Sequence, residues 1–143
     1  MERVLELGGY SARYCGRLFV QTGYSVSRVK SSPKPGWASK MAMNLFLDVE
    51  KQYLDSFRQD LPDSFDVVIV EANSADEAIN LGIEEWKNAI VVVITPFGLS
   101  GPRRNWKATS STLLAMGGYT QLMGDEGRTP LTLPGHYLSL IHI

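Results

Sequence analysis

The chain has 143 residues, 44% hydrophobic and 20% charged, which is the composition of a globular protein with a single core. Its formal net charge of −1 excludes the strongly basic balance of a general nucleic-acid binder. The charge is segregated: residues 8–47 carry +6, residues 48–85 carry −9 and residues 86–124 carry +4. Two basic stretches around an acidic one indicate a local anionic ligand rather than a long polyanion.

A β-α-β unit is predicted at the start of the chain. The apolar run Arg3–Leu7 predicts a strand that Gly8-Gly9 ends in a tight turn. Tyr24–Lys30 alternates and predicts a second strand, parallel to the first. The segment between them has the spacing of an amphipathic helix that Gly23 ends. Its expected apolar positions are Cys15, Leu18, Phe19 and Thr22, and its expected solvent-facing positions are Arg13, Arg17 and Gln21.

The rest of the chain continues as alternating strands and helices. Residues 31–40 are rich in Pro, Gly and Ser and predict a loop. Phe65–Val70 and Ala89–Ile94 are apolar on successive residues, as in parallel strands covered on both faces. Together these segments predict an α/β protein with a Rossmann-like open, mostly parallel sheet and helices on both faces. The expected helices lie at Glu50–Asp60, around Ala75–Gly82, and at Thr109–Gly118.

Composition also bounds the location of the protein. No apolar run approaches the ~20 residues that cross a bilayer, and no secretion signal is visible. The single cysteine, Cys15, cannot form an internal disulfide, which fits a reducing compartment. We therefore expect a cytoplasmic protein that binds neither a membrane nor nucleic acid.

The last six residues, Leu138–Ile143, read LSLIHI and match one frame of a sequencing-library adapter. The alternative is a genuine apolar strand end. We expect an adapter artefact, so that residues 1–137 are the natural N-terminal part of a longer chain.

An open parallel sheet binds ligands beyond the carboxyl ends of its strands. The loop after the first predicted strand opens a helix, whose free N–H groups and dipole favour a phosphate. A purely structural turn is the alternative for Gly8-Gly9. Three further loops, at Ser31-Ser32, Glu71–Ser74 and Thr95–Pro102, follow the other predicted strands.

A dinucleotide site fits this pattern poorly. The glycines do not form GxGxxG, and Lys30 stands where a ribose-binding acid is expected. A basic residue there suits a ligand with an extra phosphate on its ribose, which describes both coenzyme A and NADP. The alternative for Arg28, Lys30 and Lys34 is an ordinary solvated surface.

No catalytic cluster or metal site is evident in the sequence. Cys15 lies on the apolar face of its predicted helix and is expected in the core. His136 is the one histidine outside the suspected adapter. The sequence has no GxSxG elbow and no grouping of Cys, His and carboxylates with metal-ligand spacing, so we expect no bound metal.

The order of short motifs resembles the type III coenzyme A transferases, the CaiB/BaiF-like family that includes formyl-CoA transferase, carnitine CoA-transferases and α-methylacyl-CoA racemase. The most specific motif is Phe97–Pro102, which matches FGxxGP. The resemblance covers residues 3–137. The other matching segments are Arg3–Leu7, Gly23–Val29, Leu45–Val49, Asp66–Glu71, Ile79–Gly82, Ala115–Gly118 and Gly124–Pro130.

This resemblance implies part of a large Rossmann-like domain in an interlocked homodimer. It implies no permanently bound cofactor, because acyl-CoA is the substrate and a carboxylic acid receives the CoA. Carried over position by position, it implies that residues near the CoA are Ser11, Ala12, Arg28, Ser31, Leu47, Asn73, Leu81, Gly98 and Gly101. Lys34 is a further candidate beside them.

Several positions depart from the family pattern. Lys30 replaces an acid, Glu50 stands where a lysine is common, and Ala72-Asn73 replaces Asn-Phe. The family's nucleophilic aspartate falls near Ser139, inside the suspected adapter, so we name no catalytic residue and expect this stretch by itself to be inactive. The alternatives are a racemase or isomerase that moves an α-proton, and a non-catalytic CoA- or nucleotide-binding module.

Overall fold

The computed structural model describes residues 2–29, 41–58, 60–125 and 127–130. Five parallel strands form one sheet in the order β3-β2-β1-β4-β5. This confirms the predicted α/β, Rossmann-like architecture. The strands are β1 (Arg3–Leu7), β2 (Ser25–Val29), β3 (Gln52–Leu54), β4 (Val67–Glu71) and β5 (Ile90–Ile94).

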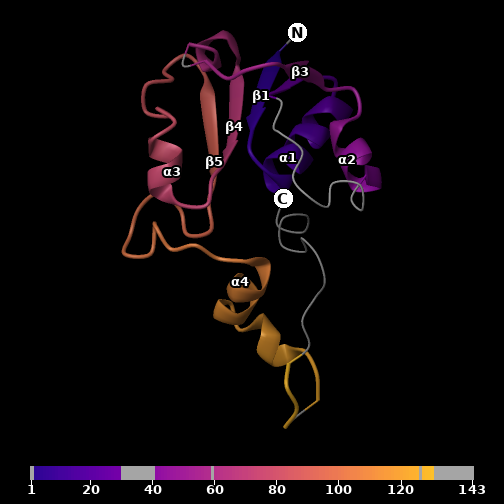
Figure 1. Ribbon diagram of the computed structural model, residues 1–143, viewed down its shortest axis with the longest axis vertical. Helices are drawn as coiled ribbons and strands as arrows, with labels where there is room; N and C mark the ends of the chain where they lie inside the picture. Colours follow the sequence, from indigo (N-terminus) through magenta and orange to yellow (C-terminus); the bar gives the residue numbers. More distant parts are fainter. Residues whose placement is uncertain (1, 30–40, 59, 126, 131–143) are drawn as a thin grey trace.

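Helices cover both faces of this sheet. Figure 1 shows α1 and α2 on one side and α3 on the other, while α4 lies beyond the end of β5. Two short 3-10 helices, η2 and η3, complete the described elements. The helical elements are α1 (Tyr10–Gln21), α2 (Met41–Asp48), η2 (Pro62–Ser64), α3 (Ala75–Ile79), α4 (Ser110–Met116) and η3 (Tyr119–Leu122).

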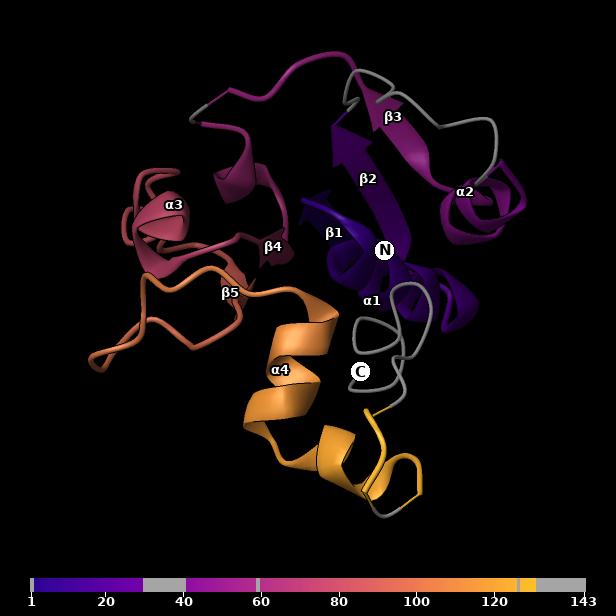
Figure 2. The same cartoon turned by 60° about the horizontal axis from the view of Figure 1, so that its bottom comes forward.

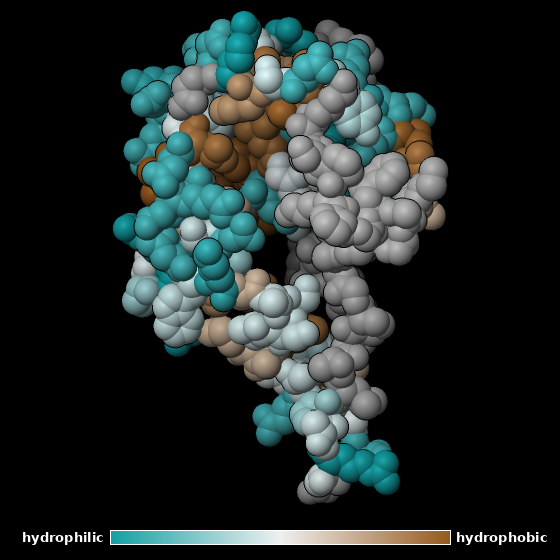
Figure 3. Space-filling model, viewed as in Figure 1, coloured by the Kyte–Doolittle hydropathy of each residue, from teal (hydrophilic) through white to brown (hydrophobic). Residues whose placement is uncertain are grey.

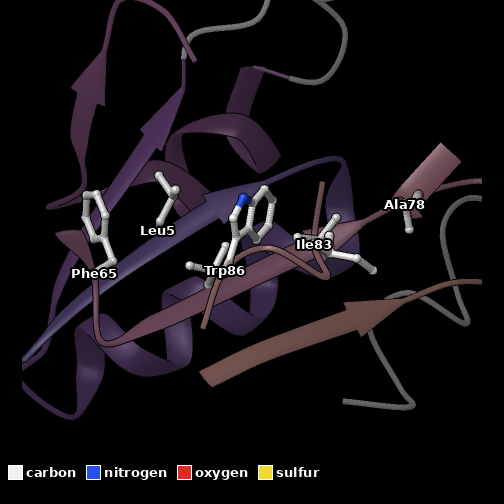
Figure 4. Close-up of a cluster of buried hydrophobic side chains, with 8 residues drawn as sticks. Leu5, Phe65, Ala78, Ile83 and Trp86 are labelled. Atoms are coloured by element: carbon white, nitrogen blue, oxygen red, sulfur yellow. The ribbon is translucent and has the colours of Figure 1, made fainter. Parts of the chain in front are cut away.

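Alternation along the central strands sends successive side chains to two separate hydrophobic clusters. Val4 and Ile69 pack with Ala12 beneath α1. Leu5 and its neighbours pack on the opposite face against α3. Figure 4 shows this second cluster, with the indole of Trp86 between Leu5 and Ile83.

Two helix starts follow from local capping. The hydroxyl of Ser74 accepts a hydrogen bond from Glu77 N (3.3 Å) at the start of α3. The hydroxyl of Thr109 accepts one from Thr112 N (3.3 Å) at the start of α4. A side-chain acceptor at the N-cap satisfies an N–H that has no partner within the helix, and both helices were predicted.

The predicted helix at Glu50–Asp60 is wrong. Gln52–Leu54 forms β3 and pairs with Ser27–Val29 of β2. The helix instead precedes this segment as α2, which the sequence pattern did not predict. Long-range pairing with β2 outweighs the weak helical spacing of three apolar residues.

The prediction that Ala89–Ile94 is covered on both faces is also wrong for the part of the chain that the structure describes. Ile90 is 69% exposed and Val92 is 40% exposed. Both residues belong to an edge strand, which pairs with β4 alone in the described sheet. The interior strand Val67–Glu71 does have the predicted burial.

Within the described residues, no helix is both long and apolar enough to cross a membrane.

Candidate functional site

The strand order places the candidate site between β1 and β4. Within the sheet, β2 and β3 lie on one side of β1. The chain then crosses over, and β4 and β5 lie on the other side of β1. In open α/β sheets, ligands bind beyond the carboxyl ends of the strands where this order reverses. Here those ends are Leu7 and Glu71, with the loop after β5 alongside (Figure 2).

The carboxylate of Glu71 occupies the N-terminus of α1. Its Oε2 accepts a hydrogen bond from the backbone N–H of Ala12 at 2.9 Å. This N–H belongs to the first turn of α1, whose donors have no partner within the helix and whose dipole favours a negative charge. The carboxylate of Glu71 therefore lies where a ligand phosphate was expected.

The turn before α1 is shaped around Glu71. A β-carbon added to Gly8 would lie 2.6 Å from Glu71 Cβ, and one added to Gly9 would lie 3.0 Å from Glu71 Oε1. Gly8 also has φ = +134°, which side-chain-bearing residues rarely adopt. The structural interpretation of Gly8-Gly9 therefore accounts for both glycines.

Ser11 and Ala12, which the resemblance implies as ligand contacts, lie in the first turn of α1. Ser11 is 7% exposed and Ala12 is fully buried. Asn73, by contrast, is exposed two residues beyond β4. Its backbone N–H and its side-chain amide donate to Glu77 Oε2 at 2.8 and 2.9 Å, which fixes the amide at the start of α3.

Gly98 and Gly101 lie in an exposed loop after β5, with φ of +76° and +91°. The following residues dock this loop on α3. The side chain of Asn105 donates to Asp76 Oδ2 (2.7 Å), and the carbonyl of Arg104 accepts from Ala75 N (3.0 Å). The two glycines therefore lie in a loop that is anchored to the start of α3. A β-carbon added to either glycine would meet no atom within 4 Å.

The exposed end of this loop combines aromatic and basic groups. The rings of Phe97 and Trp106 meet edge to face with centroids 6.0 Å apart. The guanidinium of Arg103 lies 5.1 Å from the Trp106 ring centroid, a favourable cation–π geometry. Arg103, from the second basic stretch of the sequence, thus lies in the same loop as the two glycines, after the carboxyl end of β5.

A largely buried cluster of charged and polar side chains lies under α1. We call it the Glu6 cluster; its members are Glu6, Arg13, Arg28, Asn44, Asp48, Lys51 and Tyr53. Alternation along β1 and β2 directs Glu6 and Arg28 to the α1 face, where they are register neighbours. Lys51 Nζ donates to Glu6 Oε2 (2.5 Å) and to the carbonyl of Arg13 (2.7 Å). Arg28 Nη1 lies 3.2 Å from Glu6 Oε1.

Asp48 connects the Glu6 cluster to α2. Arg13 donates to both carboxylate oxygens of Asp48, at 3.0 and 2.7 Å, and to Asn44 Oδ1 at 2.7 Å. Tyr53 donates its hydroxyl proton to Asp48 Oδ2 at 3.0 Å. Bidentate pairing of this kind fixes both partners in orientation, so α2 is held against α1 and β3.

Burial shifts the proton affinities within this cluster. It raises the pKa of the Glu6 carboxyl, against the opposing effect of Lys51. It lowers the pKa of Lys51, and the neighbouring Glu6 carboxylate partly offsets that change. Burial together with the hydrogen bond to Asp48 raises the pKa of Tyr53. Each direction follows from the cost of removing a charged form from water.

The structure corrects the expectations for Arg13 and Arg28 and tests the one for Cys15. Arg13 was expected on the solvent face of its helix, but it is 7% exposed because Asp48 and Asn44 pair with it. The solvated-surface alternative is wrong for Arg28, which is 8% exposed and pairs with Glu6 and Asp48. Cys15, expected in the core, is half-buried and packs against the cluster beneath α1.

The structure brings only some of the expected site residues together. Ser11, Ala12 and Asn73 gather around the ends of β1 and β4. Leu47 is fully buried in α2, while Leu81 packs against the cluster on the α3 face. Ser31, Lys30, Lys34, His136, Ser139 and the suspected adapter lie outside the described residues.

Sequence reasoning did not identify the partners of Glu6 or the role of Glu71. A charged residue in the middle of the apolar segment Arg3–Leu7 was the available signal for the first, because a buried charge requires a partner. The sequence also gave no sign that the backbone of Glu50 is unusual. Glu50 adopts φ = +64° at the turn that leads from α2 to the buried Lys51.

Among the described residues, no group of three or more Cys, His, Asp or Glu side chains could hold a metal ion.

Comparison with curated proteins finds one short region of similarity. Over 51 residues, 36% of this chain, it is 35% identical to "Probable CoA-transferase Rv1866" of Mycobacterium tuberculosis (strain ATCC 25618 / H37Rv). The matched region is 6% of that relative. No family model matches the chain.

Solved structures share the fold over nearly the whole chain. Rv3272 from M. tuberculosis, in its orthorhombic form, superimposes with a TM-score of 0.71 at 19% identity, covering 96% of this chain and 44% of that one. An aspartate-to-alanine mutant of Rv3272 gives 0.71 at 21% identity, with 97% and 44% coverage. The chain therefore spans less than half the length of the proteins whose fold it shares.

Proposed function

We propose that this chain is the N-terminal part of the large domain of a type III CoA-transferase. The observation that carries the proposal is the 51-residue similarity to a protein named as a probable CoA-transferase. The parallel sheet supports it, because ligands of open α/β sheets bind in the crevice beyond the strand ends where the strand order reverses, here those of β1 and β4. The complete protein would act on an acyl-CoA and a carboxylic acid as an interlocked homodimer.

The geometry favours particular residues as direct CoA contacts. Asn73, Gly98 and Gly101 are exposed on loops at the carboxyl edge of the sheet. Arg28 and Leu47 are buried, so we assign them a positioning role for β2 and α2 beneath the ligand. Ser11 and Ala12 would shape the floor of the crevice, and Ser31 remains a contact implied by the resemblance.

In the proposed reaction, an enzyme carboxylate attacks the thioester carbonyl of acyl-CoA. The C–S bond breaks, leaving a mixed acyl-enzyme anhydride and the CoA thiolate. The thiolate then attacks the enzyme's own acyl carbon, which releases the first acid and gives an enzyme–CoA thioester. An acceptor carboxylate attacks this thioester, which releases the CoA thiolate and forms a second anhydride. The thiolate then attacks the acyl carbon of the acceptor, which gives the new acyl-CoA and frees the enzyme carboxylate. The position implied for the enzyme carboxylate falls outside the described residues.

Thermal unfolding with and without ligands tests this proposal, because a ligand that binds the native state raises its apparent stability. We expect CoA to raise Tm more than NAD does, and dephospho-CoA to raise it less than CoA. Asn73→Ala should reduce the CoA-dependent shift. Asn88→Ala, an exposed residue before β5, is the matched control and should leave the shift unchanged. Equal or greater protection by NAD would overturn the proposal.

A further inference from the structure

Glu71 places a negative charge at the point where an open parallel sheet ordinarily receives a ligand phosphate. It is the last residue of β4, and its register partner in β5 is Ile94. The next residue continues the sheet contact, since Ala72 N donates to the carbonyl of Ile94 at 3.0 Å. The backbone of Glu71 is thus fixed on the edge of the crevice, while its side chain reaches across to α1.

A hydrogen bond holds the carboxylate of Glu71 at α1, and two glycines leave room for its side chain. The N–H of Ala12 donates to Oε2, which consumes a first-turn donor of α1. Gly8 and Gly9 leave room for the side chain, since a methyl group on either would press against Glu71. In dinucleotide-binding turns, glycines instead let the backbone approach the ligand pyrophosphate. Here the space that the glycines leave is filled by the protein's own acid.

We propose that Glu71 is a specificity-determining residue that closes the N-terminus of α1 to ligand phosphates. A nucleotide pyrophosphate entering this position would lose the Ala12 N–H and meet a like charge. A phosphate-bearing ligand of this crevice therefore has to place its phosphates on another part of the carboxyl edge. The loop after β5 carries Arg103, and Figure 3 shows a hydrophilic surface on the left-hand side of the molecule, where this loop lies in Figure 1.

Binding of inorganic pyrophosphate, followed by calorimetry at low salt, tests this assignment independently of CoA. The wild-type chain should bind pyrophosphate weakly. Glu71→Ala removes the carboxylate and should strengthen binding at least tenfold, with the gain lost at high salt. Glu77→Ala is the matched control, because it removes a carboxylate at the same edge that contacts Asn73 rather than α1.

The outcomes separate clearly. No gain in Glu71→Ala, or an equal gain in Glu77→Ala, overturns the proposal. If Glu71→Ala does not fold, amide NMR of the wild-type chain decides: the N–H signals of residues 9–13 should not move with pyrophosphate. A saturable shift of the Ala12 signal would overturn it. A failure of CoA to bind would leave these results unaffected, since the probe is pyrophosphate alone.

Discussion

Lys51 Nζ lies 2.5 Å from Glu6 Oε2, and at most 1% of either side chain is exposed. The pair joins the centre of the sheet to the start of β3, across 45 positions of the sequence. Removing two charges from water is costly, and only close pairing with further hydrogen bonds offsets the cost. The carbonyl of Arg13 and the guanidinium of Arg28 supply those further contacts.

Loss of one partner should therefore be worse than loss of both. We expect Lys51→Met to lower the free energy of unfolding by ~3–5 kcal/mol, because it leaves the Glu6 carboxylate without its closest buried partner. The double variant Glu6→Leu/Lys51→Met should recover most of that loss. Urea denaturation of both measures the difference, with the exposed Lys87→Met as control. A double variant that is less stable than Lys51→Met would contradict this account.

The close approach of α1 to the sheet depends on Gly16. A β-carbon there would collide with Glu6 Oε2 and would lie 3.1 Å from Lys51 Nζ. In an open helix position, Gly→Ala stabilises by about 1 kcal/mol. We expect Gly16→Ala instead to destabilise the chain. In a Glu6→Ala background its cost should shrink, as a double-mutant cycle by urea denaturation would measure. An unchanged cost would place the collision elsewhere.

Local pattern was sufficient for most of the sheet. Arg3–Leu7 was predicted with the bounds that the structure has, because an apolar run stopped by two glycines contains its own signal. α3 and α4 were also predicted, although with wider bounds than the structure has, and their N-caps lie in the sequence immediately before them. In each case the determining residues are neighbours along the chain.

The failures involve residues that are far apart in sequence. Lys51 is buried against Glu6, and the residues that follow it pair with β2 to form β3 rather than a helix. Arg13 is buried by Asp48, which lies 35 positions away. The occupation of the α1 N-terminus by Glu71 spans 59 positions. The spacing of residues within a short segment does not reveal partners that are far apart in the sequence. The strands and helices were therefore largely predictable, whereas the Glu6 cluster and the contact of Glu71 with α1 were not.

The raised pKa of Glu6 predicts an unusual pH dependence. Because burial raises this pKa above its ordinary value of 4.5, the native state holds the proton more tightly than the unfolded state does. The contribution of Glu6 to stability is therefore greatest below pH 4.5 and is lost as the pH rises through the native value. The unfolding free energy of the wild type minus that of Glu6→Gln should fall as the pH rises from 4.5 through the pKa of Glu6 in the native state. The exposed Glu84→Gln is the matched control. A difference that grows with pH would mean that Lys51 and Arg28 outweigh burial.

Cys15 offers a direct chemical probe of packing under α1, because it is the single cysteine of the chain. Burial, together with the nearby Glu6 carboxylate, raises the pKa of its thiol. Alkylation requires the thiolate, so at pH 8 iodoacetamide should modify the native protein at least tenfold more slowly than the urea-unfolded chain. Gly16→Ala, which forces α1 away from Glu6, should accelerate the native reaction, whereas Arg103→Ala in the exposed loop should not. Equal rates in the native and unfolded wild-type chain would show that α1 does not shield the thiol.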